Sequence, residues 1–260
     1  MKIVLIGSGN TATVLGKKIF RANHTIVQVY SRNHQHAADL AKELNAEAVS
    51  SYTSLTDGAD IYIIAVSDMA VAEVVNELKP VKKVVVHTAG SVSMNVLKNA
   101  SLNYGVLYPL QSLRKEMKHI PEIPFLIDGC TPDIKALLYD FAGSLSTDVQ
   151  FCNDDQRLHM HLAAVITSNF TNHLYALTEK FCGEHQLSFQ LLVPLITEVA
   201  ERLKEGNAVD MQTGPARRGD DVTIQKHLQL LKNEEQLQQL YLQLSESIRN
   251  MYTKNKNQGL

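Results

Sequence analysis

Lys2-Ile3-Val4-Leu5-Ile6, followed by Gly7-Ser8-Gly9-Asn10-Thr11-Ala12, is the stretch that decides the fold. The first five residues are almost continuously apolar, which is typical of a parallel strand buried on both faces. The next six have the form G-x-G-x-x-A, in which the first glycine permits a tight turn, the second lets the backbone approach a pyrophosphate, and the alanine allows close helix–strand packing. A helix starting at Asn10 would present free N–H groups to phosphate. We therefore expect Gly7, Ser8, Gly9, Asn10, Thr11 and Ala12 to bind a dinucleotide; an ordinary glycine turn without a ligand is the alternative.

Outward from this stretch, short β-branched runs alternate with helical patterns as far as about residue 150. The patterns predict strands at 25–30, 61–66, 84–86, 106–107 and 124–127, and helices at 10–20, 34–44, 71–78 and 132–141. Alternation of this kind predicts an α/β fold of the Rossmann type, a doubly wound parallel sheet with right-handed crossovers.

The second half of the chain has a helical texture. One pattern without Gly or Pro covers 154–181, and further helices are expected at 187–203, 222–231 and 235–252, the first of them kinked at Pro194. We therefore predict a nucleotide-binding domain at 1–150 and an all-α domain for substrate binding and dimerisation at 151–260.

The end of the second predicted strand indicates which dinucleotide is bound. An NAD site places an acid there, on the ribose 2′-OH. This sequence has Ser31-Arg32 instead, and a hydroxyl beside a guanidinium suits a 2′-phosphate. The pattern favours NADP; a solvated Arg32 at the start of a helix is the alternative.

Three more segments leave predicted strands at the edge where ligands bind in open α/β sheets. Val66 and Ser67 follow one strand, His87, Thr88, Ala89 and Gly90 follow the next, and Tyr108–Ser112 ends a third. We expect the first two segments to contact the cofactor, although turn chemistry alone would explain each of the three.

Composition narrows the classes of function. The chain has 260 residues, and 25 Lys and Arg against 27 Asp and Glu give a net charge of −2. This balance argues against bulk binding of nucleic acid or an anionic membrane. No apolar run approaches the ~20 residues of a membrane span, and the three widely spaced cysteines suit a reducing compartment. We therefore expect a cytoplasmic protein. We also expect no metal site, since neither His34-x-His36 nor His159-x-His161 has the spacing of a ligand pair.

These motifs resemble a known superfamily. The glycine turn, Ser31-Arg32 and the 65–68 segment are similar to pyrroline-5-carboxylate reductases, 6-phosphogluconate dehydrogenases and F420-dependent NADP reductases. More narrowly, His87–Ser91, His161–Val165 with Ser168–Phe170, and Thr213–Asp220 resemble a branch that joins a Rossmann-like domain to a helical DUF2520 domain and is described as NADP oxidoreductases. The resemblance implies an NADP site, a helical C-terminal domain and a homodimer formed through its helices, but no settled substrate. The hydroxyacid dehydrogenases of the superfamily place a catalytic Lys one turn before a helix Asn, whereas here Val165 precedes Asn169.

Candidate catalytic groups lie in the helical half. His161 could supply the proton that accompanies hydride transfer, and Asn169, two helical turns later, could orient a carbonyl or imine. Arg217 and Arg218 could bind an anionic substrate. The alternative for His161 and Asn169 is that they are hydrogen-bonded polar residues at a domain or dimer interface. The alternative for the two arginines is that they are solvated charges on a loop.

The sequence therefore predicts an NADP-dependent oxidoreductase that transfers hydride between NADPH and a small, anionic carbonyl or imine compound. A dinucleotide-binding sensor or scaffold without turnover is the second hypothesis, favoured by the missing Lys. A flavin-type partner such as F420 is a third.

Overall fold

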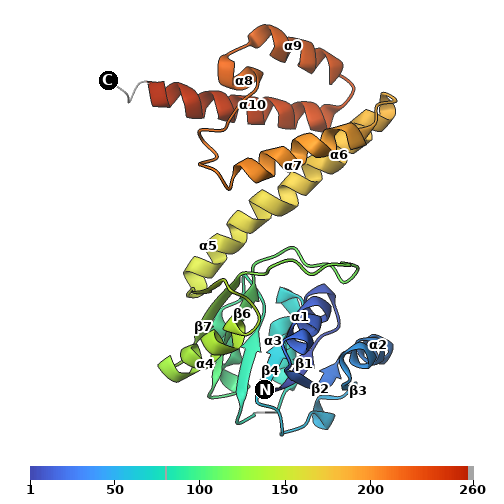
Figure 1. Ribbon diagram of the computed structural model, residues 1–260, viewed down its shortest axis with the longest axis vertical. Coiled ribbons are helices and arrows are strands. Elements are labelled where there is room, and N and C mark those ends of the chain that lie inside the picture. The colour runs from blue at the N-terminus through green and yellow to red at the C-terminus, as the bar shows by residue number, and fades with distance from the viewer. Residues whose placement is uncertain (80, 257–260) are drawn as a thin grey trace. The chain divides into compact units, whose positions relative to one another are not determined.

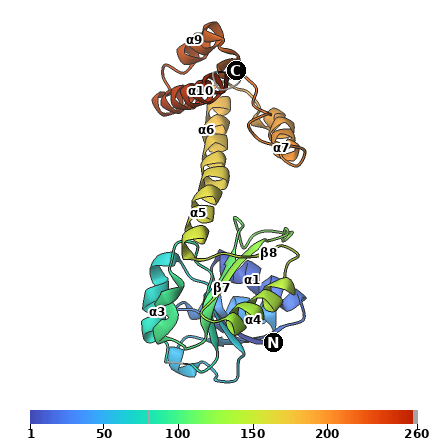
Figure 2. The ribbon, with the colours of Figure 1, turned by 90° about the vertical axis from the view of Figure 1, so that its left-hand side faces the viewer.

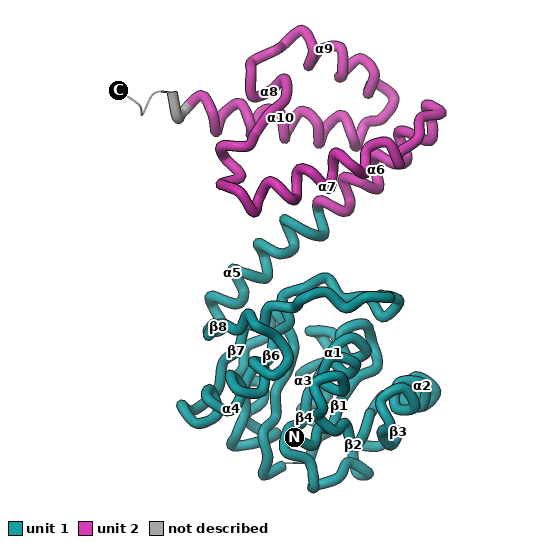
Figure 3. Tube along the Cα trace, in the orientation of Figure 1, with its two compact units in different colours: residues 1–170 teal, residues 171–260 magenta. Residues whose placement is uncertain are grey.

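The computed structural model describes residues 1–79 and 81–256. The chain divides into two compact units, Met1–Phe170 and Thr171–Leu260, which are coloured separately in Figure 3. Each unit is described by itself.

The first unit is built on one eight-stranded sheet (Figure 1). Its strands are β1 (Lys2–Ile6), β2 (Thr25–Tyr30), β3 (Glu47–Val49), β4 (Ile61–Ile64), β5 (Val84–His87), β6 (Tyr104–Pro109), β7 (Phe125–Gly129) and β8 (Val149–Phe151). Their order is β3-β2-β1-β4-β5-β6-β7-β8. Strands β2 and β4 flank β1, so the sheet order reverses next to the glycine turn, where open α/β sheets bind their ligands.

Helices cover both faces of this sheet, and the two views in Figures 1 and 2 place α3 on the face opposite α1 and α4. Their bounds are α1 (Asn10–Arg21), α2 (His34–Leu44), α3 (Val71–Glu77) and α4 (Pro132–Gly143). Alternate residues of β1 enter different cores: Ile3 and Leu5 pack with α1, α2 and α4, whereas Val4 and Ile6 pack with α3. Burial of both faces explains why β1 reads as an uninterrupted apolar run, and the predicted doubly wound α/β fold is confirmed.

The sheet differs from the prediction in one respect, because it is not wholly parallel. Strand β7 runs antiparallel to β6, with Tyr108 opposite Leu126, while the other neighbours are parallel. The connection between β6 and β7 holds no described helix that could carry the chain back to the starting edge, so the chain returns in the opposite direction. Three-residue strands β3 and β8 were also not predicted, since so short a segment carries no periodic signal.

The long helical pattern of the second half forms three consecutive segments. Helix α5 (Asp154–Ala164) is followed by a π-helix, η4 (Val165–Phe170), and by α6 (Thr171–Glu184). Helical structure therefore continues from one compact unit into the next, and the predicted domain boundary near residue 150 stays a prediction.

The rest of the second unit is helical, as expected. It contains α7 (Val193–Arg202), α8 (Pro215–Arg218), α9 (Asp221–Leu230) and α10 (Glu235–Lys256). Pro194 lies in the first turn of α7 and does not kink it, because an N–H in that turn has no partner within the helix anyway. Within residues 1–79 and 81–256, no helix has the length and apolarity that crossing a membrane requires.

Candidate functional site

The turn after β1 admits only glycine at its first position. Gly7 has a φ of +129°, and its N–H donates to the Tyr30 carbonyl oxygen at 2.8 Å. A Cβ at this position would lie 2.2 Å from the carbonyl oxygen of Ala65. The turn is therefore clamped between β2 and the end of β4, and it brings the chain directly into α1.

The start of α1 is open to a ligand. Gly9 is the N-cap residue, no side chain caps the helix, and the first turn holds no acid. A Cβ on Gly9 would meet nothing within 4 Å. The unpaired N–H groups and the positive end of the helix dipole therefore face accessible space, as an anion site requires.

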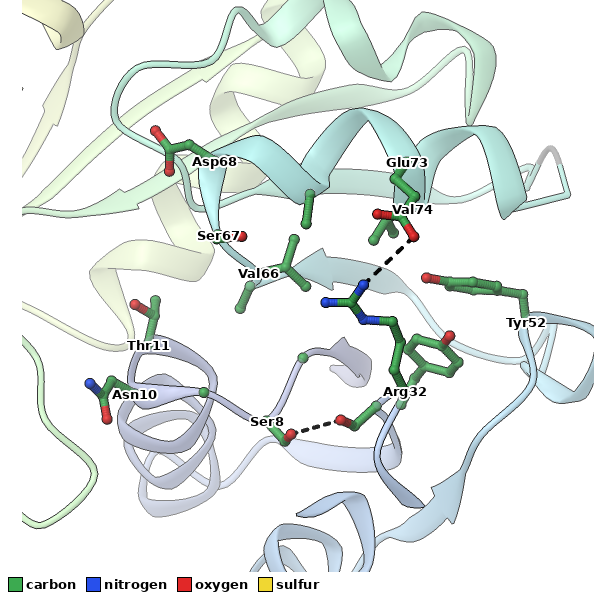
Figure 4. A pocket seen from close by; sticks show the side chains of 16 residues that line it. Ser8, Asn10, Thr11, Arg32, Tyr52, Val66, Ser67, Asp68, Glu73 and Val74 are labelled. Atoms are coloured by element: carbon green, nitrogen blue, oxygen red, sulfur yellow. Dashed lines mark hydrogen bonds and ion pairs between the residues drawn. The ribbon is translucent and has the colours of Figure 1, made fainter. Parts of the chain in front are cut away.

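A cavity of about 510 Å³ lies over this turn, at the carboxyl ends of β1, β2 and β4 (Figure 4). Its volume is typical of a small-molecule or cofactor site. The predicted residues that line it are Gly7, Ser8, Gly9, Asn10, Thr11, Ser31, Arg32, Val66 and Ser67. Ala12 is fully buried beneath the turn, where its small side chain allows α1 to pack on the sheet. The structure thus brings residues from three separate strand ends to one cavity.

Two polar pairs lie at the β2 side of this cavity. The Ser8 hydroxyl donates to the Ser31 hydroxyl at 2.8 Å, and Arg32 Nη1 lies 3.7 Å from Glu73 Oε1 (Figure 4). The Arg32 side chain is 74% exposed, so this ion pair is weak and the guanidinium can rotate toward a bound phosphate.

Two tyrosines complete that side. The Tyr30 and Tyr52 rings stack with their centroids 4.2 Å apart, and both line the cavity. Burial, followed by the hydrogen bond to Tyr30, raises the pKa of Tyr52, so this phenol is neutral at physiological pH. A pair of stacked rings offers an apolar face on which a flat base can lie.

The segment after β5 is buried beneath the sheet edge. His87 is fully buried, its Nδ1 accepts a hydrogen bond from the Ala89 N–H at 3.2 Å, and Thr88, Ala89 and Gly90 are buried with it. Burial and the nearby Arg157 charge lower the pKa of His87 to about 4, so its imidazole is neutral at physiological pH. A Cβ on Gly90 would lie 2.7 Å from Nδ1 of His161. The glycine therefore leaves the room in which His161 lies against the edge of the sheet.

His161 pairs with a tyrosine at this edge. Its Nδ1 lies 3.0 Å from the Tyr108 hydroxyl, at the end of β6. Burial, followed by the Asp68 charge, raises the pKa of Tyr108. Both residues line a second cavity of about 530 Å³, together with Gln111, Ser168 and Asn169. The two predicted catalytic residues, His161 and Asn169, thus share one cavity within the first unit.

Arg217 and Arg218 belong to the second unit. They are the last two residues of the short helix α8, and the Arg217 guanidinium lies 4.2 Å above the centre of the Tyr252 ring. Their binding of a substrate stays a prediction. In the part of the chain that the structure describes, no group of three or more His, Cys, Asp or Glu side chains could hold a metal ion.

The lining residues that were not predicted as site residues include Tyr52, Asp68, Glu73 and Tyr108. Asp68 and Tyr108 stand directly at strand ends that the sequence had placed at this edge, so their position was a usable signal. Tyr52 and Glu73 come from a short 3₁₀ helix and from α3, and no local pattern marks them.

Comparison with known proteins identifies the family. Residues 2–90 match the model "NADP oxidoreductase coenzyme F420-dependent", and residues 123–248 match DUF2520, a domain of unknown function. No curated protein matches the chain.

Solved structures extend this similarity over the whole chain. The structure of "putative NADP oxidoreductase BF3122" from Bacteroides fragilis is 40% identical and covers 96% of this chain and 98% of its own, with a TM-score of 0.89. The fold is shared with a 1-pyrroline-5-carboxylate reductase of Streptococcus pyogenes, which is 14% identical, covers 96% and 98% of the two chains and has a TM-score of 0.67. It is also shared with a reductive aminase of Aspergillus terreus in complex with NADPH, which is 14% identical, covers 99% and 94% and has a TM-score of 0.60. On these grounds the chain belongs to the NADP oxidoreductases that carry a DUF2520 region.

Proposed function

We propose that this protein reduces a small anionic carbonyl or imine compound with NADPH. One observation carries the proposal: a cavity that holds the glycine turn, the α1 N-terminus and Ser31-Arg32 opens at the same sheet edge that His161 contacts. The reductive aminase of Aspergillus terreus, which shares the fold, is in complex with NADPH.

The residues present fit this cofactor. The open N-terminus of α1 suits the diphosphate, and Arg32 beside the Ser8–Ser31 pair suits the 2′-phosphate. No acid follows β2 to bind a free ribose 2′-OH. The acid next to Arg32 is Glu73, which belongs to α3. We therefore propose NADP rather than NAD.

The chain's own residues would do the following. Bound NADPH supplies the hydride. His161 donates a proton to the carbonyl oxygen or imine nitrogen, Tyr108 holds the imidazole in place, and Asn169 orients the acceptor. Arg217 and Arg218 bind the anionic group of the substrate.

A second candidate is a dinucleotide-binding sensor without turnover. Val165 stands where the hydroxyacid dehydrogenases of the superfamily place their Lys, which favours this alternative. Because the N-terminal family model is described as F420-dependent, F420 is also a candidate redox partner.

We propose in addition a cytoplasmic homodimer formed through the C-terminal helices. Leu158 and Leu162 of α5 and Ile166 and Phe170 of η4 are each about half exposed at steps of four, a stripe that a partner helix could cover. All three cysteines are free, as a reducing compartment requires. Light scattering of the purified protein tests the dimer, and a monomer at micromolar concentration would exclude it.

Cofactor binding is the first test of the function. NADPH and NADH are titrated against the protein by nucleotide fluorescence, and Arg32→Leu is compared with the wild type. We expect the wild type to prefer NADPH and R32L to lose about tenfold or more of that affinity, with NADH unchanged. A wild-type protein that binds neither dinucleotide contradicts the proposal.

Turnover is the second test. Small keto acids and cyclic imino acids are offered with NADPH, and with reduced F420 in parallel. Oxidation of NADPH supports the reductase, and oxidation of F420 alone supports the third hypothesis. Tight NADPH binding without any turnover, accompanied by a change of oligomeric state, supports the sensor.

A further inference from the structure

A small cavity next to the dinucleotide site contains a lysine that no family motif assigns. The cavity measures about 210 Å³ and lies between α1 and α2, and Ser8 lines both it and the larger cavity. Its charged lining consists of Lys17, Asp39, Glu43 and Lys115, and His36 lines it as well. Since the Ser8 hydroxyl is hydrogen-bonded to the Ser31 hydroxyl, this cavity lies directly beside the proposed 2′-phosphate site.

The lysine is Lys115, which comes from the loop between β6 and β7. This loop passes over the start of α1 in Figures 1 and 2, where it is drawn in green. The Lys115 N–H donates to Asn10 Oδ1 at 3.1 Å, and Leu113 and Ile123 are buried at the two ends of the loop. The main chain is thus fastened to the glycine turn, and it carries the side chain to the cavity.

The charges already present in the cavity leave Lys115 available. Lys17 is paired with Glu43 at 2.7 Å, and Asp39 accepts a hydrogen bond from Gln35 at 2.8 Å. Among the residues that the structure describes, no carboxylate lies within the 4.0 Å of an ion pair from the Lys115 ammonium. An unpaired cation beside an open anion site raises the affinity for a phosphate dianion.

The first turn of α2 lies at the same place. Asn33 caps the helix by accepting from the His36 N–H, and no acid occupies the first turn. His36, in this first turn, lines the small cavity together with Lys115, so the positive end of a second helix dipole lies at that cavity.

We propose that Lys115 is a second cationic ligand of the NADP 2′-phosphate, across Ser8 from Arg32. The β6–β7 loop then takes part in the choice of NADP over NAD. The proposal rests on the proposed function, because it requires the adenosine ribose to lie at Ser31. Asp39 opposes the same phosphate, so its charge limits the affinity.

The test compares dissociation constants for NADPH and NADH in four proteins: the wild type, Lys115→Gln, Lys118→Gln and Asp39→Asn. Lys118 is the matched control, since it is an exposed lysine of the same loop that does not line the cavity. We expect K115Q to raise the dissociation constant for NADPH about tenfold and to leave that for NADH within about twofold. K118Q should change neither constant, and D39N should lower the constant for NADPH alone. The K115Q effect shrinks as salt is raised.

Two results would overturn the proposal. If K115Q binds NADPH with the wild-type affinity, the lysine is not a ligand. If K115Q binds both dinucleotides more weakly by the same factor, the lysine acts on the diphosphate or on the order of the loop, and not on the 2′-phosphate. Thermal unfolding of K115Q should match the wild type, since the N–H bonded to Asn10 is retained. Failure of the wild type to bind NADPH removes the proposed function itself, which is a different outcome.

Discussion

The Tyr108 hydroxyl lies 3.0 Å from Nδ1 of His161 and so joins the end of β6 to helix α5. With Nδ1 engaged by Tyr108, Nε2 is the nitrogen left to give a proton to a substrate; it does so from the protonated ring, whose Nδ1–H then donates to the Tyr108 oxygen. The ring is held from two sides, by this bond and by its contact with Gly90. An imidazole fixed in this way is suited to deliver a proton to one defined position.

Loss of the imidazole should affect chemistry rather than cofactor binding. We expect His161→Gln to lower kcat for an imine or carbonyl substrate by about 10²-fold or more, with an unchanged dissociation constant for NADPH. Tyr108→Phe should lower kcat less, about tenfold, without raising KM, because it releases the ring without removing it. Steady-state kinetics of both variants provides the measurement. H161Q with wild-type turnover would exclude His161 as the proton donor.

The two glycines of the turn should respond in opposite ways to alanine. Gly9→Ala places a methyl group in open space over the α1 N-terminus, so the protein should lose less than about 1 kcal/mol of stability but bind NADPH far more weakly. The methyl group of Gly7→Ala would lie 2.2 Å from the Ala65 carbonyl oxygen, on a residue whose φ is +129°. This variant should therefore lose several kcal/mol of stability. Urea unfolding and nucleotide titration separate the two effects. Equal loss of stability in both variants would contradict this reading of the turn.

Stability should fall in weak acid because of His87. Its pKa is about 4 in the folded protein and 6.5 in the unfolded chain, so the unfolded chain binds more protons between these values. The contribution of His87 is complete above pH 6.5 and is lost as the pH falls toward 4; between pH 7 and 5 the loss is about 2 kcal/mol. Urea unfolding at both pH values measures it. His87→Asn retains an acceptor for the Ala89 N–H, and it should show a smaller difference between the two pH values than the wild type does.

Arg157 and Asp154 should show strong coupling. The Arg157 side chain is 1% exposed; its Nη2 donates to Asp154 Oδ1 at 2.8 Å, whereas its Nε and Nη1 have no hydrogen-bond partner among the described residues. Asp154→Asn leaves a buried cation without its counter-charge and should cost about 3 kcal/mol. Adding Arg157→Met should recover part of that loss. A double-mutant cycle by urea unfolding measures the coupling, and purely additive losses would show that the pair is not a unit.

Much of the first unit was predictable because its signals are local. The bounds of β1, β2 and α2 agree with the apolar runs and helical patterns that predicted them. The antiparallel β7 was not predictable, because strand direction depends on the path of a connecting loop rather than on the strand's own residues. The Tyr108–His161 pair joins residues 53 positions apart, and Glu73 reaches Arg32 from another helix, so neither contact leaves a pattern in the sequence.

The wide helical turns at Val165–Phe170 determine where this chain can change its length. A π-helical segment contains an extra residue, which an ordinary α-helix would not need. Deleting one residue there would restore a regular helix and leave the later side chains close to their present orientation, whereas the same deletion in an α-helix turns every later side chain by about 100° around its axis. A deletion within α5, after His161, would therefore take Asn169 out of the cavity wall that the two residues share, although neither had been replaced. Single-residue deletions among natural variants should be tolerated in these six residues more readily than in α5 or α6, and should otherwise collect in loops such as 204–214.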